Sequence, residues 1–196
     1  MADTITTLLA GRHGHFQMES GYHAGSWFEL GSLFDRPDAL RPFVSELAGR
    51  LAAHGVDAVC GPTTGGAKLG ELISAELHIP GLVAERFETA EAGLFPIRYV
   101  VPAAQRAELR GVSVAIVDDA ISAGSAVRGT HADLLACGAR PVALGALVVF
   151  GEAAADFAAD TGLALETIQQ LPFDMWRPAD CPLCGAGVAL ERIVAT

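Results

Sequence analysis

The sequence predicts an α/β fold in which a parallel sheet of about five strands is flanked by helices and preceded by a small antiparallel element. Residues 114–117 and 142–149 are apolar runs rich in valine and leucine, which is typical of strands buried on both faces. Helical periodicity occurs between such runs, as in residues 37–55. A chain of 196 residues that is 51% hydrophobic and 18% charged can bury one sizeable core.

Residues 1–35 form the N-terminal segment. Their sequence predicts the end of a short helix followed by a hairpin. Residues 4–11 end in a leucine-rich stretch that Gly11 stops. Residues 14–21 alternate apolar and polar side chains and close in a Ser-Gly turn, so we expect a hairpin strand with residues 27–31 as its partner.

Strands and helices alternate in the next segment, residues 36–170, which we expect to form the α/β core. Leucines and valines recur at helical spacing from Pro37, and Gly55 is placed to end that helix. A second helix is expected to begin within residues 61–70 and to break after Leu77, at a His-Ile-Pro sequence. Strands are expected at residues 56–60, 81–84, 96–101 and 140–150. Residues 171–196, the tail, are expected to belong to the same domain.

The stretch from Val114 to Ala126 contains the clearest functional signal in the chain. A buried strand ends at two carboxylates, Asp118 and Asp119, and a turn of small and hydroxylated residues then leads into a helix over residues 126–137. Backbone N–H groups of such a turn, together with the helix dipole, bind anions. Carboxylates beside a phosphate site are explained if the phosphate belongs to a sugar whose hydroxyls need acceptors. The alternative is a buried strand with an incidental acidic turn.

This stretch resembles the signature of the type I phosphoribosyltransferases, which bind phosphoribosyl pyrophosphate (PRPP). The signature consists of hydrophobic residues, two acids, two more hydrophobic residues, Thr or Ser, a small residue, Gly, and a further hydroxyl or small residue. The sequence Gly-Pro-Thr-Thr-Gly-Gly at residues 61–66 resembles the pyrophosphate loop of the same family. The resemblance implies a PRPP site formed by Thr63, Thr64, Gly65, Gly66, Asp118, Asp119, Ala120, Ile121, Ser122, Ala123, Gly124, Ser125 and Ala126.

The N-terminal segment and the tail resemble those of the orotate phosphoribosyltransferases. That group has an N-terminal hood with a Phe-x-Leu-x-Ser-Gly strand and an aromatic pair, here matched by residues 16–21 and by Trp27 and Phe28. The resemblance implies a base site formed by His23, Trp27, Phe28, Ser122 and Phe150. Ordinary core packing is the alternative for the two aromatic residues.

Two departures from the orotate pattern concern charge. The resemblance implies a closing loop with an Arg and one or more Lys, but only Arg86 matches, since no Lys follows Lys68. Arg98 can replace the missing lysines in part, as a bidentate phosphate donor. The alternative is that Arg86 and Arg98 are solvated surface charges. Phe150 stands where the orotate enzymes have an Arg that pairs with the orotate carboxylate, which predicts weak use of orotate.

The reaction implied by the resemblance is attack of a base nitrogen on C1 of PRPP, with release of pyrophosphate. Asp118, Asp119 and Arg86 are the expected catalytic residues, and Mg²⁺ is expected to arrive with PRPP. A shared closing loop implies a homodimer. Three hypotheses remain: transfer to orotate, transfer to a different base or small nucleophile, and a PRPP- or nucleotide-sensing relative without catalysis.

Composition and cysteine usage limit the remaining possibilities. A formal net charge of −10 argues against a nucleic-acid partner, and no apolar run approaches the roughly 18–20 residues of a membrane span. The first residues lack the basic start of a signal peptide, so we expect a cytoplasmic protein with reduced thiols.

Cys181 and Cys184 form a Cys-Pro-Leu-Cys turn that is half of a zinc ribbon. A second Cys pair is not visible in the sequence, so both a bound metal and a buried reduced turn remain open. Some orotate phosphoribosyltransferases end in a similar Cys-Pro-Leu-Cys sequence, so the tail strengthens the resemblance without implying zinc.

Overall fold

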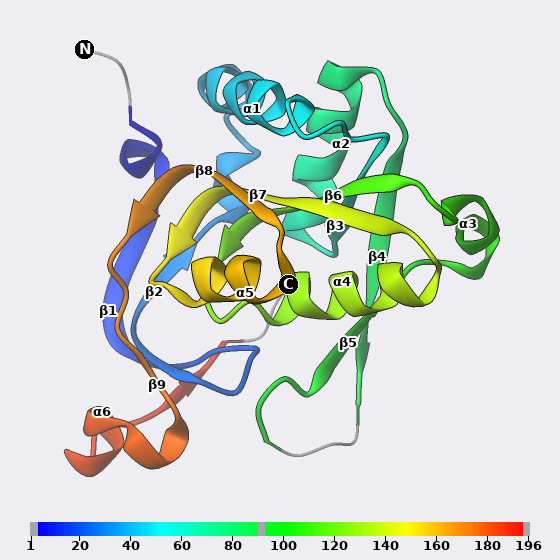
Figure 1. Cartoon of the computed structure of the whole chain (residues 1–196). Coiled ribbons are helices and arrows are strands. Elements are labelled where there is room, and N and C mark those ends of the chain that lie inside the picture. Colours follow the sequence, from blue (N-terminus) through cyan, green and yellow to red (C-terminus); the bar gives the residue numbers. More distant parts are fainter. Residues whose placement is uncertain (1–3, 90–92, 194–196) are drawn as a thin grey trace.

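The computed structural model describes residues 4–89 and 93–193, which form two sheets (Figure 1). The larger sheet has the strand order β5-β4-β3-β6-β7-β8. All of its neighbouring strands run parallel except β5, which pairs antiparallel with β4 at one edge. Its strands are β3 (Ala58–Pro62), β4 (Gly81–Glu88), β5 (Ile97–Val100), β6 (Ser113–Ile121), β7 (Arg140–Phe150) and β8 (Ala164–Leu171).

Helices cover both faces of the large sheet (Figure 1). On one face, α1 (Pro37–Ala52) and α2 (Gly65–Leu77) bury leucine and isoleucine side chains against β3, β6 and β7. On the other face, α4 (Ser125–Ala136) and α5 (Ala153–Thr161) pack over a second apolar cluster. Short helical turns complete this part of the chain: η2 (Gly31–Leu33), α3 (Ala103–Arg106) and η3 (Ala107–Leu109). The alternation of apolar strands and amphipathic helices thus gives the predicted layered α/β fold.

The smaller sheet, which we call the hood sheet, joins the two ends of the chain. Its order is β10-β1-β2-β9, so tail strands flank the N-terminal hairpin on both sides. The pairs β1–β2 and β2–β9 are antiparallel, whereas β1–β10 is parallel. The strands are β1 (Ala10–Gln17), β2 (His23–Glu29), β9 (Met175–Trp176) and β10 (Glu191–Arg192), and η4 (Pro178–Asp180) and α6 (Pro182–Gly185) lie between the last two.

The structure differs from the sequence-based expectation in two places. The large sheet has six strands because β8 was not expected: it is a half-buried edge strand with Glu and Gln among its residues and lacks a continuous apolar run. The expected helix end at residues 4–11 is only a short 3₁₀ turn, η1 (Ile5–Leu8), and β1 already begins at Ala10.

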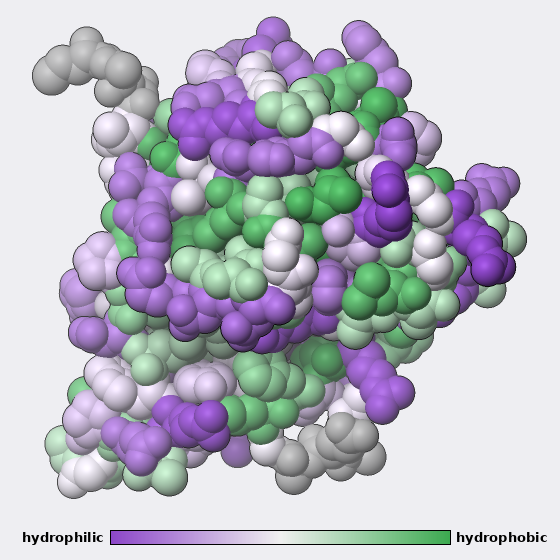
Figure 2. All heavy atoms as spheres, viewed as in Figure 1, coloured by the Kyte–Doolittle hydropathy of each residue, from purple (hydrophilic) through white to green (hydrophobic). Residues whose placement is uncertain are grey.

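The outer surface is mixed in character (Figure 2). On the face shown, hydrophilic residues cover much of the helical layer at the top of the view, and smaller hydrophobic patches lie between hydrophilic bands. None of the helices in the two described ranges is long and apolar enough to cross a membrane.

Candidate functional site

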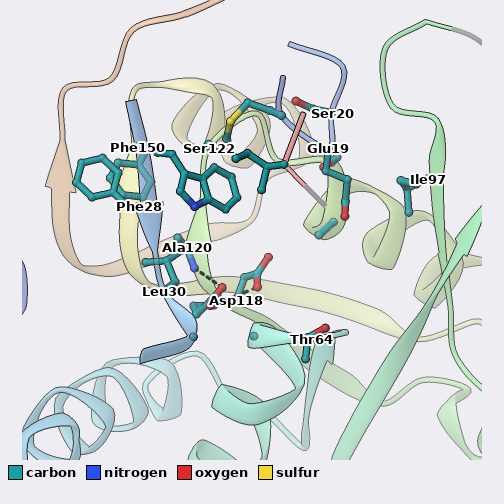
Figure 3. A pocket seen from close by; sticks show the side chains of 18 of the residues that line it. Glu19, Ser20, Phe28, Leu30, Thr64, Ile97, Asp118, Ala120, Ser122 and Phe150 are labelled. Atoms are coloured by element: carbon teal, nitrogen blue, oxygen red, sulfur yellow. Dashed lines mark hydrogen bonds between the residues drawn. The ribbon is translucent and has the colours of Figure 1, made fainter. Parts of the chain in front are cut away.

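A pocket of about 910 Å³ lies between the carboxyl ends of the large sheet and the hood sheet. Ligands of open α/β sheets bind at this end of the strands. The wall on the sheet side comes from β3, β6, β7 and the segments that follow them, and the opposite wall comes from β1, β2 and the tail. Figure 3 shows acidic side chains and aromatic rings at separate places along this pocket.

Asp118 and Asp119 lie in the last part of β6 and line the pocket. The Ala120 N–H donates to Asp119 Oδ1 at 2.8 Å, and the Asp119 N–H donates to Asp118 Oδ1 at 3.1 Å. Burial raises the pKa of Asp118 well above its ordinary value, and the neighbouring charge of Asp119 raises it further. Burial also raises the pKa of Asp119. The free protein therefore holds two carboxyl groups in an environment that disfavours their negative charge.

The glycine-rich loop packs directly on this carboxylate pair. A Cβ atom at Gly65 would overlap the carboxylate of Asp119, so glycine is required by close approach. A Cβ atom at Gly66 would come within 2.9 Å of Asp118 Oδ1. The peptide bond between Thr63 and Thr64 is cis. The two segments predicted from sequence are thus neighbours in space.

The turn after β6 leads into the N-terminus of α4. Gly124 is the N-cap residue, with φ of +78°, a left-handed conformation that favours glycine. The expected PRPP-site residues that line the pocket are Thr63, Thr64, Gly65, Asp118, Asp119, Ala120, Ser122, Ser125 and Ala126. The other four, Gly66, Ile121, Ala123 and Gly124, lie beside them in the chain without lining it.

Arg86 reaches the pocket from β4 and is held by acidic side chains. Its Nε donates to Glu19 Oε2 at 3.0 Å, and its Nη1 donates to Glu88 Oε1 at 3.0 Å. The Tyr99 hydroxyl donates to the second oxygen of Glu19 at 2.5 Å. Burial and the charge of Glu19 together raise the pKa of Tyr99. Arg98 does not line the pocket in the part of the chain that the structure describes.

Aromatic side chains form the other end of the pocket. The rings of Phe28 and Phe150 are stacked, with centroids 4.8 Å apart and an interplanar angle of 19° (Figure 3). Phe173 lies 5.1 Å from Phe150, measured between centroids. Trp27 and Ser122, two of the residues predicted for the base site, also line the pocket. His23 does not: it is 5% exposed and contacts His15 instead.

Several lining residues were not identified from the sequence. Glu19 follows β1, Tyr99 lies on β5, and Phe173 precedes β9, so three distant segments bring them together. The tail also contributes Glu191, which forms a bidentate ion pair with Arg12 at 2.6 and 2.8 Å. Of these residues, only Glu19 lies within a sequence pattern that was recognised, the Phe-x-Met-Glu-Ser-Gly strand. Its contacts with Arg86 and Tyr99 depend on tertiary packing.

Comparison with known proteins identifies related sequences and folds. No protein-family model matches the chain. Orotate phosphoribosyltransferase of Thermotoga maritima is 30% identical over 182 residues, which cover 91% of this chain and 89% of that protein. The crystal structure of orotate phosphoribosyltransferase from Aeropyrum pernix matches with a TM-score of 0.64 and 21% identity, covering 83% of this chain and 88% of that one.

Adenine phosphoribosyltransferase from Thermoanaerobacter pseudethanolicus matches with a TM-score of 0.68 and 14% identity, covering 85% of this chain and 98% of that one. These structural matches show a type I phosphoribosyltransferase fold. The sequence match to the Thermotoga maritima protein covers about nine tenths of both chains. On that match, the chain belongs to the orotate phosphoribosyltransferase family.

Proposed function

We propose that this protein transfers the phosphoribosyl group of PRPP to the pyrimidine base orotate and releases pyrophosphate. The observation that carries the proposal is the pair Asp118–Asp119 at the end of β6, directly before a small-residue turn and the N-terminus of α4. This arrangement combines acceptors for sugar hydroxyls with donors for a phosphate. Relatives with the name orotate phosphoribosyltransferase favour this reading over transfer to another base or a sensing role.

In this proposal the chain positions groups and stabilises charge. Ser122, Ser125 and the backbone N–H groups at the start of α4 hold the 5-phosphate. Asp118 and Asp119 accept hydrogen bonds from the ribose hydroxyls and face the positive charge that develops on the ring. Thr63, Thr64 and Arg86 hold the pyrophosphate as it leaves. The hood excludes water from the reacting carbon.

Magnesium fits the donor set of the pocket. Mg²⁺ prefers oxygen ligands and is usually bound by one or two carboxylates together with substrate phosphates. Asp118 and Asp119 offer carboxylate oxygens at the pocket surface and would hold the ion together with PRPP. A bound Mg²⁺ would offset the negative charge of pyrophosphate.

The aromatic end of the pocket is the proposed base site. Stacked Phe28 and Phe150 suit a planar ring, but Phe150 supplies no charge for a carboxylate. Cationic side chains elsewhere on the pocket wall are Arg12, Lys68, Arg86 and Arg192. Arg12 and Arg86 are already paired with glutamates. Weak orotate use therefore remains a prediction.

Phe150→Arg is expected to lower the Michaelis constant for orotate several-fold, because the guanidinium can pair with the orotate carboxylate. The measurement is formation of nucleotide from PRPP with orotate, uracil and cytosine, in the wild type and the variant. Phe150→Gln is the matched control, since it adds polarity without charge. Efficient wild-type turnover at micromolar orotate would show that another cation already pairs with the carboxylate. Absence of turnover on every base would contradict the proposed function.

A two-fold homodimer is also proposed, because the family resemblance implies that the closing-loop segment after Arg86 is shared between neighbouring subunits. Large apolar side chains are exposed near this segment: Phe87 is 48% and Phe95 39% exposed. Light scattering over a dilution series is expected to give twice the mass of one chain. Phe87→Asp should shift the population toward monomer. A wild type that is monomeric at every concentration would exclude the shared site.

A further inference from the structure

Four metal-binding side chains from opposite ends of the chain meet outside the pocket. His15 lies on β1, His23 on β2, and Cys181 and Cys184 lie at and just after the start of α6. Their ligand atoms all lie within 4.8 Å of one another. The two cysteines are free thiols. Because 158 or more residues separate each cysteine from each histidine, only the fold brings the four together.

Four of the six distances between the ligand atoms are close to the edges of a metal-centred tetrahedron. Zinc bonds of about 2.0–2.1 Å to nitrogen and 2.3 Å to sulfur imply edges of roughly 3.3 to 3.8 Å. His15 Nε2 lies 3.1 Å from His23 Nδ1, and 3.4 and 3.7 Å from the sulfurs of Cys181 and Cys184. Cys184 Sγ lies 3.3 Å from His23 Nδ1. These four separations are close to the tetrahedral edges, so these atoms need to move little to bind an ion.

The orientation of His15 supports ligand binding by its Nε2 atom. Its Nδ1 atom lies 2.8 Å from the Val188 carbonyl oxygen, which can only accept a hydrogen bond. Nδ1 therefore carries the proton, and in the neutral ring the lone pair of Nε2 faces the cluster. A backbone carbonyl that fixes the tautomer in this way is a common partner of metal-binding histidines. His15, His23 and Cys181 are buried, with exposed fractions of 3%, 5% and 5%.

We propose that His15, His23, Cys181 and Cys184 bind one Zn²⁺ ion in a structural site. Two thiolates and two imidazoles in tetrahedral array are a preferred zinc environment, and softer ligands of this kind disfavour Mg²⁺ and Ca²⁺. The four protein ligands fill the coordination sphere, so the ion has no open position for substrate. His23 then acts as a zinc ligand and has no part in base binding.

Zinc in this position would fasten the tail to the hood sheet. The ligands lie on the two central hood strands and on the tail segment between β9 and β10, which pair with those strands. Met18, Phe28 and Phe173 of the same regions line the pocket. The ion would therefore hold one wall of the pocket in place without contacting substrate.

Metal analysis of the full chain without an affinity tag tests the proposal. We expect about one zinc per chain by mass spectrometry of the metal content. Chain stripped with a chelator and titrated with Co²⁺ should give the visible absorption of tetrahedral cobalt and a thiolate charge-transfer band, which Zn²⁺ then abolishes. The melting temperature should rise on metal addition, since the ion binds the folded state.

The variant that tests the ligand set is Cys184→Ser, because Cys184 is the exposed ligand and its replacement disturbs packing least. The thiolate band of cobalt should weaken and zinc should be lost. Cys137→Ser is the matched control, since this thiol contacts Asp133 far from the cluster, and its metal content should stay unchanged. Wild-type chain that gives no tetrahedral cobalt spectrum would overturn the proposal, even if Cys184→Ser fails to fold. A Cys181–Cys184 disulfide in freshly purified protein, seen by alkylation without reductant, would overturn it as well.

Discussion

Asp118→Asn is expected to lower kcat/KM for PRPP by about 10²–10³-fold, the range found when one preorganised hydrogen-bonding group is removed from an active site. The same change is expected to raise the melting temperature of the unliganded protein. Asp118 is 9% exposed, and its negative charge is disfavoured by burial and by Asp119 and Glu19. Asparagine keeps the shape and removes the charge, so the cost of that charge in the free protein disappears.

The pH dependence of stability and of activity tests the role of Asp118 in a second way. Because the folded-state pKa of Asp118 is raised, the folded protein binds more protons than the unfolded chain between the ordinary value of about 3.9 and the raised value. The stability contribution of this group therefore falls as pH rises through that window. Activity should rise over the same window, since the ionised form is the proposed acceptor for ribose hydroxyls. Between pH 4 and pH 8, the contribution of Asp118 should make the free energy of unfolding, measured in urea, fall with pH while kcat/KM rises.

Asp133→Asn serves as the control for this prediction. Asp133 Oδ2 accepts from the Val101 N–H at 2.8 Å and pairs with Arg106 at 2.8 Å, away from the pocket. Its replacement should lower stability and leave kcat/KM within about twofold of wild type. If Asp118→Asn instead kept full activity, the carboxylate pair would not be the ribose acceptor. If Asp118→Asn lowered the stability of the protein, burial would not be the dominant influence on the pKa of Asp118.

Local chain order explains why the core of the site could be predicted. A strand, two acids, a small turn and a helix start follow one another within thirteen residues, so their juxtaposition needs no tertiary information. The structure has β6 and α4 where this pattern indicated them. The glycine loop could be assigned for a different reason: it follows another strand of the sheet, and the carboxyl ends of parallel strands meet at the same sheet edge.

Parts of the site that depend on distant segments were not predictable in this way. The Glu19–Arg86–Tyr99 contacts join a turn after β1 to strands β4 and β5. The His15–His23–Cys181–Cys184 cluster is a second case. The Cys-x-x-Cys pair is visible in the sequence, but only the register of the hood sheet brings the two histidines to it. His23, for example, is opposite Trp176, next to the segment that bears the cysteines.

Gly124→Val is expected to reduce affinity for ribose 5-phosphate by at least about 100-fold while the protein still folds. A Cβ atom at this position would meet nothing closer than Arg128 Nε at 3.4 Å, so space is adequate. The obstacle is the φ of +78°, which costs an ordinary residue roughly 1–2 kcal/mol and a β-branched one more. Relief of that strain would turn the backbone N–H groups at the start of α4 away from the proposed phosphate position.

Gly162→Val separates this effect from general destabilisation. Gly162 ends α5 with φ of +71°, and a Cβ atom there would meet nothing within 4 Å. The two variants therefore introduce a similar backbone strain and should lose a similar few degrees of melting temperature. Only Gly124→Val should lose ribose 5-phosphate binding in calorimetric titration, because Gly162 is remote from the pocket. Equal affinity of both variants for the ligand would place the phosphate elsewhere than at the N-terminus of α4.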